Sequence, residues 1–132
     1  MAQYLNAATL LELARAAEAR ASAPCPCMKT PLDGWQSQPL SLDETQFAEI
    51  GTLSTEDYVE PTFSEYLPGK TTYWSVDAPI APRYFPYNRC AVWECKLCGR
   101  LYLHYTEGGG YFVDRRIRAV KAGLVEDVPL ES

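Results

Sequence analysis

The 132-residue sequence lacks the motifs by which many small enzymes are recognised. It contains no phosphate-binding loop and no dinucleotide-binding motif, and its single histidine is His104. A catalytic base has to lie within hydrogen-bond reach of its nucleophile, and no Ser/His/Asp set is evident. We therefore lean away from an enzyme but keep enzymatic activity as an alternative.

An export signal and a membrane span are also missing from the sequence pattern. Ala21-Ser22-Ala23 imitates a signal-peptidase site, but the run before it is interrupted by Glu12, Arg15, Glu18 and Arg20. A signal peptide needs an unbroken apolar core, and a membrane span needs a longer apolar run. We expect a cytoplasmic protein whose five cysteines stay reduced or bind metal.

Basic residues are absent between Thr30 and Gly69, where the chain carries eight acidic residues. Residues 80–121 are basic, with a net charge of +5, while the whole chain has a net charge of −5. The two parts either face each other within one fold or form an interface with another subunit or a basic protein partner. A solvated acidic face is the simplest interpretation. The overall charge argues against nucleic-acid binding.

The composition, with 47% hydrophobic residues, predicts one α+β domain over residues 1–132. Residues 1–23 contain a predicted helix, because apolar side chains recur at helical spacing: Leu10, Leu13, Ala14 and Ala17. Its cap is either Asn6 or Thr9, and Pro24 ends it. We expect the helix to pack on its own domain. A homodimer formed through the helix is the alternative.

Residues 24–88 are predicted to be irregular, acidic and aromatic, with many prolines. Within them, the run from Phe47 to Leu53 is either a strand or the end of a short helix capped at Ser41. The aromatic residues are expected to cover the sheet that follows. Alternatively they line a small-molecule pocket, with these candidate residues: Tyr84, Phe85, Tyr87, Arg115, Arg116 and Arg118.

Residues 89–121 predict an antiparallel β-meander with strands near 89–94, 101–106 and 111–118. Its turns fall at Cys95-Lys96-Leu97-Cys98-Gly99 and at three consecutive glycines, 108–110. In the last strand, the alternation places Tyr111, Val113 and Ile117 on an apolar face and Arg118 on the opposite face.

Two cysteines two residues apart, followed by glycine, form a turn that can direct both thiolates at one metal ion. Cys25 and Cys27, on a stiff proline-flanked loop, supply a second pair. We therefore predict a structural metal site of Cys25, Cys27, Cys95 and Cys98. Zinc is the expected metal, and iron is the alternative because four thiolates accept both.

Two further residues compete for a place in this site. Cys90, Cys95 and Cys98 match the spacing of a plant-type [2Fe–2S] ferredoxin loop, but no fourth cysteine follows. An extended strand would also separate Cys90 from Cys95 by roughly 16 Å. We interpret Cys90 as a buried thiol. His104 lies six residues beyond Cys98 on a departing strand, so we expect it outside the site.

The Cys95-x-x-Cys98-Gly99 segment between two strands resembles the zinc knuckle of zinc ribbons and rubredoxins, over about residues 89–106. The second pair, Cys25-x-Cys27, is closer spaced than a second knuckle. The whole chain also resembles a small bacterial protein. The resemblance implies a structural zinc site, or a rubredoxin-like iron centre for electron transfer. From the acidic stretch we separately predict a non-enzymatic protein-interaction module that binds a basic partner.

Overall fold

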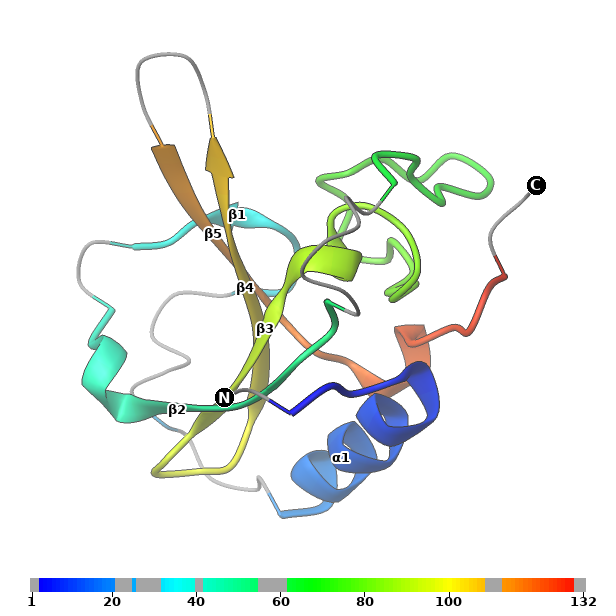
Figure 1. Cartoon of the computed structure of the whole chain (residues 1–132). Coiled ribbons are helices and arrows are strands. Elements are labelled where there is room, and N and C mark those ends of the chain that lie inside the picture. The colour runs from blue at the N-terminus through cyan, green and yellow to red at the C-terminus, as the bar shows by residue number, and fades with distance from the viewer. Residues whose placement is uncertain are drawn as a thin grey trace.

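A five-stranded antiparallel sheet, in the order β1-β5-β4-β3-β2, organises the chain (Figure 1). The strands are β1 Gln36–Ser37, β2 Phe47–Thr52, β3 Ala91–Cys95, β4 Leu101–Gly108 and β5 Val113–Ala119. The computed structural model describes residues 3–20, 25, 32–39, 42–54, 62–108 and 113–129. Together with one α-helix at the N-terminus, the sheet confirms the predicted α+β class.

Helix α1, Ala7–Arg20, packs on one face of the sheet (Figure 1). Asn6 caps it, because the Asn6 side-chain oxygen accepts a hydrogen bond from the Thr9 backbone N–H at 2.8 Å. The buried helix residues include Leu10, Ala14 and Ala17, as the helical spacing predicts. Among the described residues, no helix is long and apolar enough to cross a membrane.

The main core lies between this face of the sheet, α1 and the loops that precede β3. Val92 and Leu103, which are paired across β3 and β4, are fully buried in it. Trp35 contributes an aromatic cluster, with ring centroids 5.0 Å from Tyr105 and 5.7 Å from Tyr87. Of the aromatic residues before β3 that were predicted to cover the sheet, Tyr87 therefore does so.

A smaller second core covers the opposite face of the sheet. Its buried residues are Leu32, Phe47, Cys95, Tyr102 and Ile117. The Phe47 ring stacks on Trp93 at 5.5 Å and meets Tyr102 edge-on at 5.4 Å. Cys25 and Cys98 pack against the same cluster, so the predicted metal ligands border this second core.

The prediction that residues 24–88 are irregular is wrong for two strands, β1 and β2. β2 resolves the ambiguity at Phe47–Thr52 in favour of a strand, with a register shift between Glu49 and Gly51 that interrupts the simple alternation. A short 3₁₀ helix, η2 Glu44–Gln46, precedes it and is capped by Asp43. Ser41, the predicted cap, lies outside the described residues. The described residues 62–86 contain no helix or strand.

Two further 3₁₀ helices flank the C-terminal strands. They are η3 Tyr87–Arg89 before β3 and η4 Ala122–Leu124 after β5. The glycine turn at 109–110 and Tyr111 lie outside the described residues. The predicted meander is otherwise present, with no strand boundary shifted by more than two residues.

Ile117 and Arg118 lie on opposite faces of β5, as predicted, but the expected burial is wrong at Val113 and at Arg118. Val113 is 67% exposed, because the β4–β5 hairpin extends beyond the rest of the sheet (Figure 1). Arg118 is fully buried on the main-core side. Its guanidinium donates hydrogen bonds to the Tyr87 hydroxyl and to the Ala78 carbonyl, the latter at 2.6 Å, so the preceding loop is tied to β5.

The N-terminal segment lies along the end of the edge strand β2. The Thr52 N–H donates to the Gln3 carbonyl, and the Leu5 N–H donates to the Thr52 carbonyl, both at 2.8 Å. Gly51 permits this approach, because a Cβ there would lie 2.6 Å from the Leu5 side chain. The N-terminal backbone therefore pairs with part of the sheet edge.

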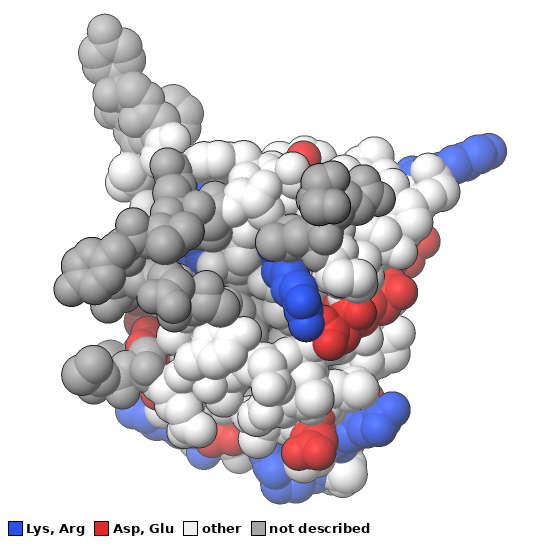
Figure 2. Space-filling view, turned by 45° about the vertical axis from the view of Figure 1, so that its right-hand side comes forward, with Lys and Arg blue, Asp and Glu red and all other residues white. Residues whose placement is uncertain are grey.

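The acidic and basic parts of the chain meet inside one fold. Glu44 pairs with Arg115 at 2.5 Å, and Asp33 pairs with Lys121 at 3.4 Å. On the face shown in Figure 2, acidic and basic side chains lie near one another rather than in two separate regions. Part of the charge asymmetry along the sequence is therefore satisfied within the chain.

Candidate metal centre

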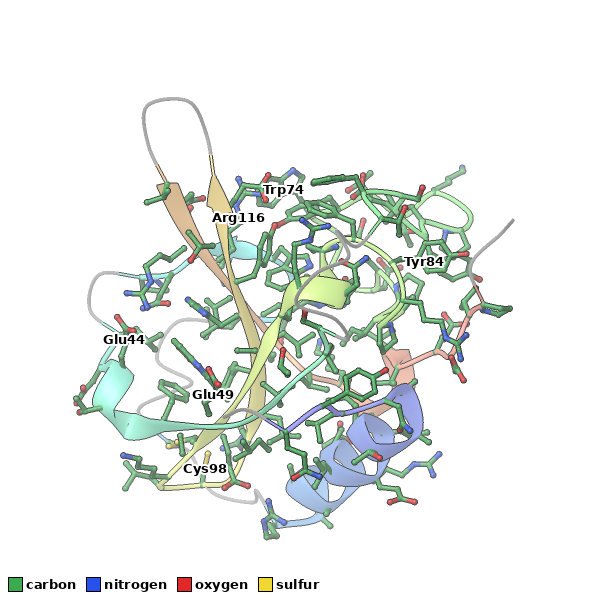
Figure 3. All side chains as sticks on the ribbon, viewed as in Figure 1. Glu44, Glu49, Trp74, Tyr84, Cys98 and Arg116 are labelled. Carbon is green, nitrogen blue, oxygen red and sulfur yellow. The ribbon has the colours of Figure 1, made fainter. Side chains whose placement is uncertain are left out.

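Cys95 and Cys98 lie at the turn between β3 and β4 (Figure 3). The Gly99 N–H donates to the Cys95 carbonyl, and the Cys95 N–H donates to the Arg100 carbonyl, both at 2.8 Å. Gly99 has a φ of 83°, a conformation that strongly favours glycine. The Cys-x-x-Cys-Gly sequence thus forms the tight turn that its pattern predicts.

Cys25 approaches this turn from a segment 70 residues away in sequence. The Sγ atoms of Cys25, Cys95 and Cys98 all lie within 4.8 Å of one another. The Cys25 and Cys95 sulfurs are 3.6 Å apart, too far for a disulfide bond. Two thiolates on one tetrahedral zinc ion would be about 3.8 Å apart at a Zn–S distance of about 2.3 Å. The three thiols are therefore close enough to hold one metal ion.

The predicted fourth ligand, Cys27, lies outside the described residues. A complete tetrahedral set of four thiolates therefore stays a prediction. Cys95 is buried, with 1% of its surface exposed, while Cys25 and Cys98 are partly exposed. The site consequently lies at the border of the second core, with one ligand inside and two nearer the surface.

The surroundings of Cys95 favour its thiolate form. Burial raises the pKa of the Cys95 thiol, but hydrogen bonds outweigh this effect and lower the pKa to about 6. The donors are the Gln46 side chain, the backbone N–H groups of Cys98 and Leu97, and the Cys25 thiol. Because metals bind the thiolate and not the thiol, these donors prepare Cys95 as a ligand.

Gln46 is a contributor to the site that sequence reasoning missed. Its side-chain nitrogen lies 3.3 Å from the Cys95 sulfur and 3.7 Å from the Cys25 sulfur. The backbone carbonyl of Gln46 accepts a hydrogen bond of 2.8 Å from the backbone N–H of Lys96, inside the cysteine turn. Gln46 lies between the two cysteine pairs in sequence and belongs to no motif with either of them, so no sequence signal identified it.

Cys90 lies away from the cluster and is fully buried in the main core. Its thiol donates a hydrogen bond to the Pro86 carbonyl at 3.2 Å, and burial raises its pKa well above the ordinary value. The interpretation of Cys90 as a buried thiol is confirmed.

His104 is not part of the three-cysteine cluster. Its ring stacks on the Trp93 ring, with centroids 4.2 Å apart and planes 10° apart. Burial, followed by the positive charge of Arg115, lowers the pKa of His104 to about 4, although Glu44 opposes the effect. Its Nε2 atom has no hydrogen-bond partner among the residues that the structure describes.

The three arginines of the alternative aromatic pocket have partners within the chain. Arg115 forms two hydrogen bonds with Glu44, at 2.5 and 2.6 Å. Arg116 pairs with Asp114 at 2.9 Å and lies over the Trp74 ring (Figure 3). Arg118 is buried against Tyr87.

A cavity of about 300 Å³ includes Arg115 but none of the aromatic residues predicted to line a pocket. Its lining residues are Gln38, Pro39, Leu42, Glu44, Val113, Asp114 and Arg115. This cavity is therefore not the predicted pocket, in which Tyr84, Phe85 and Tyr87 would lie together with the arginines.

Comparison with known proteins adds no family to this picture. The chain matches no family model, and searches of the curated proteins and of the solved structures found no significant match. The fold and the cysteine cluster therefore carry the functional argument alone.

Proposed function

We propose that this chain is a zinc-binding protein with a structural metal site formed by Cys25, Cys27, Cys95 and Cys98. One observation carries the proposal: the thiols of Cys25, Cys95 and Cys98 converge from distant parts of the sequence to within 4.8 Å of one another. Soft thiolate ligands in a compact cluster suit zinc, and Cys27 would complete the tetrahedron.

A four-thiolate zinc site stabilises a fold rather than catalysing a reaction. Four protein ligands leave no position open for water or substrate. The metal would instead close a loop of about 70 residues between Cys25 and Cys95, and its binding free energy would become folding free energy. The ion would also close the border of the second core, where Cys25 and Cys98 are partly exposed.

The wider role that fits such a site is a non-enzymatic protein-interaction module. Internal pairing of Arg115 and Arg116 supports this over an anion-binding enzyme. Within the acidic stretch, and among the residues that the structure describes, Glu49 and Glu65 are exposed and form no ion pair, so we expect them to face a basic partner. Capture of that partner should weaken with added salt and with the double substitution Glu49→Gln and Glu65→Gln. Capture unchanged by both would contradict a basic partner.

Rubredoxin-like electron transfer is the second candidate, and the hydrogen bonds to Cys95 favour it. N–H groups directed at ligand sulfurs tune the reduction potential of iron–thiolate centres. In this reading, the same cysteines would hold one iron ion. Protein carrying ferric iron on four thiolates would be red as purified, whereas the zinc protein would be colourless.

Elemental analysis of protein purified without added metal tests the proposal. We expect one zinc ion per chain in the unmodified protein, and loss of zinc in Cys98→Ser and in Cys27→Ser. Cys90→Ser is the matched control, because a serine hydroxyl can keep the hydrogen bond to Pro86 and the residue is remote from the cluster.

Each result separates the candidates. Zinc retained in Cys27→Ser would remove Cys27 from the ligand set. Iron in the unmodified protein would replace the structural role by electron transfer. Protein that holds no metal even after incubation with zinc would overturn both candidates.

A further inference from the structure

Gln46 connects the cysteine turn to a different part of the chain through both its backbone and its side chain. The backbone carbonyl accepts from Lys96 at 2.8 Å, within the turn that bears Cys95 and Cys98. The side-chain nitrogen approaches the sulfurs of Cys95 and Cys25. Gln46 therefore contacts both Cys25 and Cys95, the two predicted ligands at the ends of the loop that the metal would close.

The position of Gln46 is fixed by interactions that do not involve the cysteines. Gln46 is the last residue of η2, and its N–H donates to the Asp43 carbonyl at 3.0 Å. The Asp43 carboxylate holds the first turn by accepting from the Thr45 N–H at 3.0 Å and the Thr45 hydroxyl at 2.6 Å. Phe47, the next residue, is buried in the second core. The backbone that carries the Gln46 amide is thus held in place without a metal.

The chemistry of the amide suits two neighbouring thiolates. A glutamine nitrogen carries two N–H donors, so one can be directed at each sulfur. Donation to a charged acceptor is stronger than donation to a neutral one. Four thiolates around a divalent ion carry a net charge of −2, and N–H donors offset part of it without adding a competing ligand.

We propose that Gln46 is a positioning residue that aligns Cys25 and Cys95 for a shared metal ion by directing its side-chain N–H groups at both sulfurs. The inference deepens the proposed metal site and rests on it. The donor geometry is provided by η2, so the site is partly assembled in the metal-free chain. In proteins, groups that hydrogen-bond to metal ligands typically contribute 10- to 100-fold to metal affinity.

Gln46→Met tests the role, because methionine keeps the length of the side chain and removes the donors. Zinc and cobalt affinities are measured by competition with a chromophoric chelator. We expect both to be about 10- to 100-fold weaker than in the unmodified protein. We also expect the sulfur-to-cobalt charge-transfer bands to move to lower energy, since sulfurs without N–H donors are more electron-rich. Gln3→Met is the matched control, at an exposed glutamine remote from the cluster.

Gln46→Glu is the second variant and preserves the shape of the side chain. A carboxylate facing two thiolates repels them, so we expect weaker binding than in Gln46→Met. If Gln46→Met does not fold, as judged by its near-ultraviolet circular dichroism, Gln46→Glu decides the question alone.

The outcomes distinguish this inference from the proposed function. If the unmodified protein binds neither zinc nor cobalt, the metal site itself fails. If the unmodified protein binds both ions and the folded Gln46 variants bind them with unchanged affinity and unchanged cobalt bands, only the role of Gln46 is overturned.

Discussion

The two faces of the sheet are stabilised in different ways. The main core combines α1, the sheet and the loops before β3, and its side chains include the fully buried Leu10, Val92 and Leu103. The second core is smaller, and its edge is formed by Cys25 and Cys98, which are partly exposed. Apolar burial can stabilise the first face by itself, because the favourable free energy of burial increases with the apolar area removed from water.

The contrast shows where a metal would matter most in a small domain. A face that buries few side chains gains little from the hydrophobic effect, and a metal–thiolate cluster can supply what is missing. The tryptophans make the comparison measurable, because Trp35 lies in the main core and Trp93 packs against the second core. The following predictions test this division, from the largest expected effect to the smallest.

Metal removal should have the largest effect and should begin at the second core. A chelator that strips the site is expected to lower the Tm by on the order of 10 °C, since several kcal/mol of metal-binding energy contributes to folding. With fluorotryptophan labelling, the ¹⁹F signal of Trp93 should shift on metal removal before that of Trp35. Equal and simultaneous changes at both tryptophans would contradict the division into two cores.

Truncation in the main core should destabilise the protein without weakening its metal site. Leu103→Ala, at a fully buried position, is expected to lower the free energy of unfolding by about 2–5 kcal/mol. Urea denaturation of the metal-loaded protein measures this, and chelator competition measures the zinc affinity.

The matched substitution in the second core is Phe47→Ala. Phe47 is paired with Cys95 across β2 and β3, so its truncation should reduce zinc affinity as well as stability. If Leu103→Ala and Phe47→Ala weakened zinc binding equally, the two cores would not be separable.

Acid should act through the second face, where His104 stacks on Trp93. The pKa of His104 is lowered to about 4 in the folded state, against an ordinary value of 6.5. Between these values the unfolded chain binds more protons than the folded one, so stability falls as the pH decreases from about 6.5 to about 4. His104→Gln should flatten this part of the stability profile. The difference between the two profiles isolates His104 from thiol and carboxyl groups, and identical slopes would contradict the prediction.

The smallest effect is expected at the ion pair between Glu44 and Arg115. Both side chains are more than 40% exposed, so solvent screens their attraction. Arg115→Ala should therefore cost about 0–1 kcal/mol of stability, and the cost should shrink with added salt. A loss as large as that of Leu103→Ala would show that this surface contact supports the second face.

Local chemistry made part of the structure predictable from the sequence. The spacing of Leu10, Ala14 and Ala17 identified the helix, because an amphipathic period depends on no distant contact. The Cys-x-x-Cys-Gly turn was predictable because Gly99 and two nearby thiols specify it locally. Convergence with Cys25 followed from the needs of a metal ion, although it requires contact across the whole chain.

The parts of the fold and of the site that the sequence did not predict depend on tertiary contacts, which leave no periodic pattern in the sequence. β1 is only two residues long, and the register shift in β2 breaks the alternation that identifies a strand. Arg118 occupies an alternating position that predicts exposure, but the loop at Ala78 and Tyr87 covers it and accepts hydrogen bonds from its Nη1 and Nη2 atoms. Gln46 reaches the clustered cysteines only because η2 is packed beside the cysteine turn.

The contact between the N-terminal segment and Thr52 has a consequence for self-association. An unpaired strand edge is a template for pairing with another chain, and β2 is the last strand of the sheet. Gln3 and Leu5 occupy the backbone groups of Thr52, while Gly51 leaves the space that this covering needs. A side chain at Gly51 would displace the segment and bare that part of the edge. The absence of a side chain at Gly51 thus allows the N-terminal segment to cover part of an edge that could otherwise pair with another chain.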